Sequence, residues 1–285
     1  MWHRNPGWET TYSRRGAHNT KPVKKQTALE PAFVLIGDST TANNTVTPNS
    51  GGWGDGFCAS LRPGVSCSNF GSNGATTGTI VDRGVYGDAL GRVKEQVGMG
   101  KAVFVTLQFG HNDQKVGPPE STAQNLTRFV EDIQGLGANP ILLTPLSRRS
   151  FNENGTIADQ LAAWGDAARG VATANNDPLL PLLEASIHYL ESIGQAPSQL
   201  LNRLPADRTH LNVGGQHLFG RMVADLMRLF VPFEERYGTS EPFVVDAPLS
   251  EAIWTGKQYV YTAVCPSYNA SDCEGIAPAG TDYTK

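Results

Sequence analysis

The sequence has no apolar run of membrane-spanning length, so nothing in it predicts a transmembrane helix. It also lacks a strong charge of one sign: 23 Lys and Arg residues stand against 27 Asp and Glu residues, a formal net charge of −4. That balance gives no reason to expect a nucleic-acid partner. The 285 residues, 39% of them hydrophobic, are enough for one large α/β domain with a sizeable core. We expect a globular protein with neither a membrane nor a nucleic-acid partner.

Cysteine is scarce, and the four cysteines form two local pairs, Cys58 with Cys67 and Cys265 with Cys273. Neither pair has the C-x-x-C spacing of a zinc site or a redox motif. We predict two short-range disulfides, which would require an oxidising compartment. Four free buried thiols are the alternative.

Four N-x-[ST] sequons also favour a secretory route, because that is where such sequons receive glycans. We predict glycans on Asn125, Asn154 and Asn269, and lower occupancy at Asn43, where a glycan would crowd a candidate nucleophile four residues earlier. The protein is therefore expected to be extracellular. In conflict with this expectation, residues 1–30 are polar and basic and contain no apolar signal-peptide core. We interpret them as a disordered lead-in.

Apolar, strand-forming segments alternate with amphipathic helical patterns along the chain. The predicted strands are Ala32–Ile36, Val65–Phe70, Val103–Phe109, Pro140–Leu146 and, with prolines that suit a sheet edge, Pro178–Leu183. The predicted helices are Glu120–Gly135, Val213–Val231, Gly87–Val97 and Gln160–Ala174. This alternation predicts an α/β fold with a parallel sheet covered by helices on both faces.

The pattern changes at about Pro232, where regular alternation of strands and helices ends. We interpret residues 31–231 as the main domain. Residues 232–285 are expected to form a C-terminal appendage packed on the same domain, with a short strand at Tyr259–Val264 and a tip closed by the second disulfide.

Polar or glycine-rich turns follow three of the predicted strands. Gly37-Asp38-Ser39 follows the first, a turn with Gly74 follows the second, and Asn112 follows the third. The carboxyl ends of parallel strands meet at one edge of a sheet, where functional groups gather. A hydroxyl, an unobstructed backbone N–H and an amide donor are what acyl transfer needs. An ordinary turn, with Asp38 or Ser39 capping a helix, is the simpler interpretation of the first segment alone.

A candidate base lies in the segment LPADRTHLNVGG, before the last helix of the main domain. Asp207 and His210 are three residues apart, which lets the carboxylate fold back onto the imidazole. A carboxylate on one ring nitrogen orients the ring, and the other nitrogen can then accept the serine proton. Taken alone, His210 is better explained as a polar residue at a helix N-terminus.

The motifs IGDST, NFGSNGATT, FGHND and DRTH occur in this order between about Phe33 and Phe230. This order and spacing resemble the four sequence blocks of the GDSL/SGNH hydrolases. Within that superfamily, the segments GDSTTANN, GGWGDGF, GHND and TPLSRRSF are most similar to rhamnogalacturonan acetylesterases.

The resemblance implies a three-layer αβα sandwich, flavodoxin-like, with a central five-stranded parallel sheet and no metal or other cofactor. It implies Ser39 as nucleophile, His210 as base and Asp207 as the group that orients the base. Ser39, Gly74 and Asn112 would supply the oxyanion hole. The implied reaction is removal of acetyl groups from a pectin-type polysaccharide or oligosaccharide. Separately from the resemblance, we expect the enzyme to be a monomer.

Three further residues are candidates for substrate binding. Arg148 and Arg149 follow the fourth predicted strand and could pair with galacturonate carboxylates, or form a solvated surface pair. Trp53 could stack on a sugar, or be a buried aromatic. Many relatives have an arginine after the glycine of the second block, where this chain has Ala75. That departure weakens the substrate expectation and leaves the reaction class untouched.

Three other functions compete with a carbohydrate acetylesterase. A metal-dependent phosphoesterase would use ligands from His111, Asp113, Asp207, His210 and His217, but the order Gly-His-Asn-Asp matches such enzymes only in composition. A lipase or thioesterase with the same triad would act on a longer acyl group, although no long apolar lid segment is visible. A non-catalytic carbohydrate-binding protein is disfavoured because all the expected catalytic residue types are present.

Overall fold

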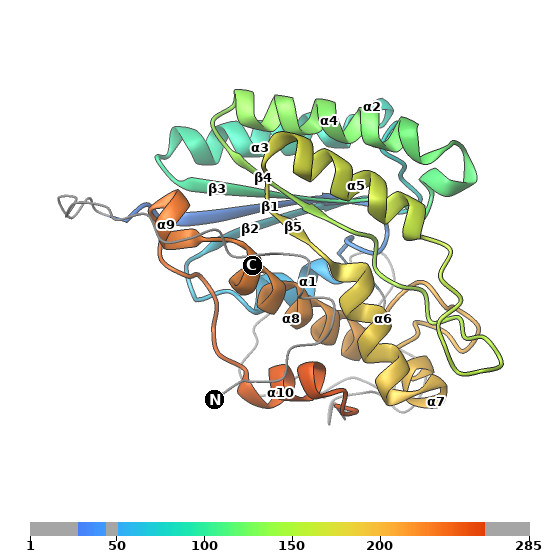
Figure 1. Ribbon diagram of the computed structural model, residues 1–285. Helices are drawn as coiled ribbons and strands as arrows, with labels where there is room; N and C mark the ends of the chain where they lie inside the picture. Colours follow the sequence, from blue (N-terminus) through green and yellow to red (C-terminus); the bar gives the residue numbers. More distant parts are fainter. Residues whose placement is uncertain (1–27, 44–50, 260–285) are drawn as a thin grey trace.

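The computed structural model describes residues 28–43 and 51–259, and its centre is a five-stranded sheet (Figure 1). All neighbouring strands are parallel, in the order β2-β1-β3-β4-β5. The strands are β1 (Pro31–Gly37), β2 (Ser66–Gly71), β3 (Ala102–Gln108), β4 (Asn139–Leu143) and β5 (Leu179–Leu180). The prediction of an α/β fold with a five-stranded parallel sheet is confirmed.

Helices cover both faces of the sheet and make the protein a three-layer sandwich (Figure 1). One face carries α3 (Val85–Gly98), α4 (Pro119–Gly135) and α5 (Ala162–Asn175). The other carries α1 (Gly54–Ala59), α6 (Leu182–Ile193) and α8 (Val213–Phe230). The shorter elements are α2 (Thr79–Asp82), η2 (Asp113–Lys115), α7 (Gln195–Gln199), α9 (Phe233–Tyr237) and α10 (Ala247–Thr255).

The alternation of side chains along β1 divides the core into two clusters. Phe33 and Leu35 belong to the cluster beneath α1 and α8, whereas Val34 and Ile36 belong to the cluster beneath α3 and α4. Successive side chains of a strand point to opposite faces, so a strand buried on both faces is continuously apolar. The sheet is therefore held from both sides, and its strand ends are fixed relative to one another.

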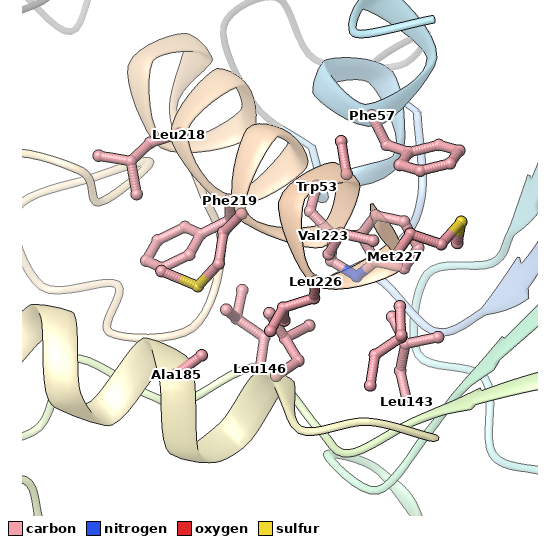
Figure 2. Close-up of a cluster of buried hydrophobic side chains, with 14 of the residues drawn as sticks. Trp53, Phe57, Leu143, Leu146, Ala185, Leu218, Phe219, Val223, Leu226 and Met227 are labelled. Carbon is pink, nitrogen blue, oxygen red and sulfur yellow. The ribbon is translucent and has the colours of Figure 1, made fainter. Parts of the chain in front are cut away.

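The cluster under α8 is rich in aromatic and aliphatic side chains (Figure 2). Trp53 precedes α1 and meets Phe57 edge-on, with ring centroids 6.1 Å apart. From α8 the cluster receives Leu218, Phe219, Val223, Leu226 and Met227. Close approach of α1 and α8 is possible because Gly56 and Gly220 face each other, where a Cβ on either would overlap the backbone of the other helix.

Two predicted strands are shorter than expected. The fourth ends at Leu143, and the fifth consists only of Leu179–Leu180 before α6 begins at Leu182. Pro181 is the N-cap of α6. The apolar run that continues into α6 cannot be told from a strand by its periodicity, because a buried helix and a buried strand both read as continuous apolar sequence. The four predicted helices correspond to α3, α4, α5 and α8, and the other helices in the described residues, α1 and α6 among them, were not predicted.

Residues beyond Pro232 pack on the same core. Phe233, Phe243 and Leu249 are buried in the cluster beneath α8, and the indole nitrogen of Trp254 in α10 donates a hydrogen bond of 2.9 Å to Asp225 of α8. The predicted strand at Tyr259–Val264 and the second cysteine pair lie almost wholly outside the described residues. Among the helices that are described, none combines the length and the apolar character needed to span a bilayer.

The predicted disulfide between Cys58 and Cys67 is present and joins α1 to β2. Cys58 lies in the helix that directly follows Trp53. Cys265 and Cys273 lie outside the described residues, so their pairing stays a prediction.

Candidate active site

Ser39 lies in the turn that follows β1, at the carboxyl edge of the sheet. The turn is closed by backbone hydrogen bonds of 3.1 Å from Thr41 and Ala42 to the carbonyl oxygen of Asp38. The Asp38 carboxylate is buried and accepts hydrogen bonds of 2.8 Å from the backbone and the hydroxyl of Thr40. Asp38 therefore orders the turn, and Ser39 is held with only 5% of its surface exposed.

The structure brings Ser39 and His210 together from positions 171 residues apart. The His210 Nε2 atom lies 2.9 Å from Ser39 Oγ. The His210 Nδ1 atom lies 3.0 Å from Asp207 Oδ2 and 3.2 Å from Asp207 Oδ1. A carboxylate can only accept, so Nδ1 carries the proton and Nε2 is free to accept the serine hydrogen. The three side chains form a continuous proton relay with the geometry of a Ser-His-Asp triad.

Asp207 is held ionised by its surroundings. Its Oδ1 atom accepts backbone hydrogen bonds from Thr209 at 3.1 Å and His210 at 2.9 Å, and Arg203 Nε lies 3.1 Å from Oδ2. Partial burial opposes ionisation, but these backbone N–H groups and the His210 imidazole outweigh it and lower the pKa of Asp207. The carboxylate is therefore available to His210 at neutral pH.

The three candidate oxyanion donors follow the carboxyl ends of three neighbouring strands, β1, β2 and β3. They are the backbone N–H groups of Ser39 and Gly74 and the side-chain amide of Asn112. Gly74 has a φ of 71°, in the left-handed region that favours glycine. Within residues 28–43 and 51–259, neither backbone N–H has a hydrogen-bond acceptor. The Asn112 Nδ2 atom donates one hydrogen to the carbonyl oxygen of Ala75 at 3.0 Å and keeps a second.

The prediction of substrate binding is wrong for two of the three candidate residues, because their side chains are buried. Trp53 is 0% exposed and lies in the core beneath α8, so it cannot stack on a sugar. Arg149 is also 0% exposed. Its guanidinium donates to Asn202 Oδ1 at 2.5 Å and to the backbone carbonyl of His210 at 2.7 Å, so it supports the loop that carries the triad histidine.

Arg148 remains at the edge of the site and is half-buried. Its Nε atom donates to the hydroxyl of Thr209 at 3.3 Å, and Nη2 donates to the carbonyl oxygen of His111 at 3.4 Å. Burial lowers the pKa of Arg148, and the charge of Asp38 opposes this. The buried His111 ring lies beneath the site, with Nδ1 3.4 Å from Asp38 Oδ2.

The predicted glycan sites differ in accessibility. The Asn125 Nδ2 atom, which would carry a glycan, donates a hydrogen bond of 3.0 Å to the Thr77 hydroxyl. Asn154 is exposed in a turn. Asn269 lies outside the described residues. Among the described residues, no three His, Cys, Asp or Glu side chains gather into a group that could hold a metal ion.

Sequence reasoning missed three residues that contact the site. Gln108 lies under the nucleophile turn, and Arg83 and Lys115 contact the groups that carry the oxyanion donors. The position of Gln108 at a strand end was the available signal for that residue. Arg83 and Lys115 had none, because an exposed cation in a polar segment is ordinary.

Known proteins resemble this chain in sequence and in fold. The rhamnogalacturonan acetylesterase RhgT of Bacillus subtilis (strain 168) is 30% identical over 226 residues, covering 73% of this chain and 94% of that protein. The probable rhamnogalacturonan acetylesterase YesY of the same strain is 26% identical, covering 70% and 94%.

A solved structure of an acetylxylan esterase from Geobacillus stearothermophilus superposes with a TM-score of 0.52 at 19% identity. The superposition covers 72% of this chain and 96% of that one, which shows a common fold. A profile of the GDSL-like lipase/acylhydrolase family matches residues 35–218, well over half of the chain. The chain therefore belongs to the GDSL-like lipase/acylhydrolase family.

Proposed function

We propose that this carboxylic ester hydrolase removes O-acetyl groups from a carbohydrate, with acetylated rhamnogalacturonan as its substrate. The observation that carries the chemistry is the relay from Asp207 through His210 to Ser39, with 2.9 Å between His210 Nε2 and Ser39 Oγ. The substrate rests on the two relatives named as rhamnogalacturonan acetylesterases.

In the proposed reaction, Ser39 Oγ attacks the acetyl carbonyl carbon while His210 Nε2 takes the hydroxyl proton. The negative charge that develops on the carbonyl oxygen is bound by the N–H groups of Ser39 and Gly74 and by the amide of Asn112. Collapse of the tetrahedral adduct breaks the bond to the sugar oxygen, which leaves with the proton from His210. Water, activated by His210, then hydrolyses acetyl-Ser39 to acetate and restores the enzyme.

The test is acetate release from acetylated rhamnogalacturonan, acetylated xylan and an aryl acetate. The proteins are wild type, Ser39→Ala and a control, Ser192→Ala, at an exposed position near the end of α6. We expect the highest kcat/KM on rhamnogalacturonan, a loss of about 10³-fold or more in Ser39→Ala, and no loss in the control. Equal activity of Ser39→Ala and wild type would refute the serine mechanism. A preference for xylan would keep the mechanism and refute the substrate.

Arg148 is part of this proposal as the cation that binds a galacturonate carboxylate. This role is supported by the half-buried position of the Arg148 side chain, which is hydrogen-bonded to Thr209, the residue before His210. Arg148→Gln should raise KM for rhamnogalacturonan and leave KM for the aryl acetate unchanged. An equal rise in KM for both substrates would argue against carboxylate binding.

Secretion belongs to the same proposal, and the disulfide between Cys58 and Cys67 supports it because such bonds persist in oxidising compartments. Peptide mapping of the enzyme from its natural source, without reduction, should recover the linked peptides from the extracellular fraction. Recovery of the enzyme only inside cells, with both thiols reduced, would contradict it.

A further inference from the structure

The three candidate oxyanion donors share a feature of their own amide groups. Each donor N–H belongs to an amide whose carbonyl oxygen is itself hydrogen-bonded. For the Ser39 N–H, that oxygen is the carbonyl of Asp38, which accepts from the backbones of Thr41 and Ala42 at 3.1 Å each. For the other two donors, the group on the carbonyl oxygen is a side-chain cation.

Arg83 binds the amide that carries the Gly74 donor. The residue follows α2, and its Nη1 atom donates to the carbonyl oxygen of Asn73 at 2.8 Å and to the hydroxyl of Ser72 at 3.2 Å. The Asn73 carbonyl and the Gly74 N–H are the two ends of one peptide group. A cation on the oxygen draws electron density from the nitrogen, which makes the N–H a stronger donor.

Lys115 binds the amide that carries the third donor. The residue is the last of η2, and its Nζ atom donates to Asn112 Oδ1 at 2.9 Å. Asn112 Nδ2 donates to the Ala75 carbonyl on the other side at 3.0 Å. Lys115 can only donate and the Ala75 carbonyl can only accept, so the two partners fix which end of the amide is the nitrogen.

Neither cation is neutralised by a carboxylate within 4.0 Å in the part of the chain that the structure describes. Other cations do have such a partner: Arg203 lies 3.1 Å from Asp207, and Arg92 lies 2.8 Å from Glu95. The charges of Arg83 and Lys115 therefore act on the amides they touch. Both side chains are exposed, so water and salt reduce the effect without removing it.

We propose that Arg83 and Lys115 are positioning residues that orient and polarise the Gly74 and Asn112 donors of the oxyanion hole. The inference rests on the proposed function, because these donors matter only if an oxyanion forms there. Its consequence is specific: the two cations stabilise the transition state more than the bound ester. Losing them should lower kcat and leave KM nearly unchanged.

The variants are Arg83→Met, Lys115→Met and the double variant, with Arg83→Lys and Lys115→Arg as conservative replacements. Methionine keeps much of the apolar stem and removes the charge. Lys94→Met is the matched control. It removes one exposed positive charge within α3, outside the loops at the carboxyl ends of the strands. The substrate is a neutral aryl acetate, which keeps binding of an acidic sugar out of the result.

We expect each single charge loss to lower kcat about three- to tenfold with KM within about twofold, since a whole oxyanion donor is worth about 10²- to 10³-fold. The double variant should show roughly the product, because the cations bind different amides. The conservative variants should recover most of kcat. Inhibition by an arylboronic acid, which forms a tetrahedral adduct with the serine, should weaken in proportion to kcat.

Each alternative outcome overturns a different claim. If Ser39→Ala is inactive but the folded double variant keeps wild-type kcat, only this inference fails. A rise in KM at constant kcat would mean that the cations bind substrate, which also overturns it. An active Ser39→Ala enzyme would refute the proposed function and this inference together. If the double variant unfolds, the boronic-acid affinities of the single variants decide, and unchanged affinities overturn the inference.

Discussion

The indole nitrogen of Trp53 donates a hydrogen bond of 3.1 Å to the side-chain oxygen of Gln108. Both residues are fully buried, and they belong to the segment before α1 and to the end of β3. The same oxygen accepts from the hydroxyl of Thr41 at 2.9 Å, and the hydroxyl of Thr40 lies 2.7 Å away. Gln108 therefore ties the turn that carries Ser39 to the central strand and to the core.

Replacing Gln108 by methionine should disturb this turn. The change leaves the Trp53 indole and the Thr41 hydroxyl buried without their acceptor, at about 1–3 kcal/mol for each unsatisfied group. We expect urea unfolding to show a loss of about 2–5 kcal/mol and kcat to fall about tenfold or more, because Ser39 is no longer held in place.

Trp53→Phe is the matched comparison for Gln108→Met. It removes one donor and leaves the Gln108 side-chain oxygen with the hydrogen bond from the Thr41 hydroxyl, so no buried acceptor is left empty. Activity should fall less than in Gln108→Met. An equal effect on kcat in the two variants would show that the indole, and not the glutamine oxygen, holds the turn.

The sheet and the triad could be predicted because their signals are local. The run from Ala32 to Ile36 is strand-forming on both faces, and it ends at a glycine before the candidate nucleophile. Asp207 and His210 are close enough in sequence for contact within one turn, and motif order supplied the link to Ser39. In each case the residue type and its position in a short segment together indicate its role.

Other contacts could not be predicted because they depend on tertiary packing. Arg149 follows Arg148 directly, but one guanidinium is fully buried against the loop of His210 and the other is half-buried at the edge of the site. No pattern in the sequence distinguishes the two. Leu182 similarly continues an apolar run as the first residue of a helix, because the chain turns at Pro181.

Gly220→Ala should destabilise the protein because α1 and α8 pack backbone to backbone at this position. A Cβ on Gly220 would overlap the backbone of Gly56 and Phe57, which cannot move as a flexible side chain could. We expect a loss of about 1–3 kcal/mol or more in urea unfolding, as for overpacking against atoms that cannot move aside.

Gly91→Ala in α3 is the control for that substitution. A Cβ there meets no atom within 4 Å, so only helix propensity changes. The variant should gain about 0.5–1 kcal/mol. Opposite signs for the two glycine substitutions are the expected result. A neutral Gly220→Ala would mean that the helices can separate without loss of packing.

Arg149→Lys tests whether the guanidinium fork, and not the charge alone, supports His210. Burial lowers the pKa of Arg149 to about 9 against the opposing effect of Asp207, so the group stays charged at neutral pH. A lysine cannot reach both Asn202 and the His210 carbonyl with the same geometry. We expect a loss of about 2–4 kcal/mol in unfolding free energy and a lower kcat.

Arg148→Lys provides the contrast, since that side chain is half-buried and makes only long hydrogen bonds of 3.3 and 3.4 Å. The free energy of unfolding of the Arg148→Lys variant should differ from that of wild type by less than about 1 kcal/mol. Comparable losses in the two variants would show that the bonds of Arg149 to the histidine loop contribute little.

Asp207→Asn should affect both catalysis and the response of stability to acid. The amide no longer selects the His210 tautomer that presents Nε2 to Ser39, and kcat should fall by about 10²- to 10⁴-fold.

Because the folded protein lowers the pKa of Asp207 below its ordinary 3.8, the ionised carboxylate contributes stability above that pH. That contribution is lost as the pH falls through the lowered pKa. The difference in unfolding free energy between wild type and Asp207→Asn should therefore be constant well above pH 3.8 and shrink below it. Asp38, whose pKa is also lowered, is present in both proteins, so its own titration largely cancels in the difference. Urea titrations of both proteins on either side of pH 3.8 measure this difference. A difference that grows on acidification would mean that the loop around His210 does not stabilise the charged form of Asp207.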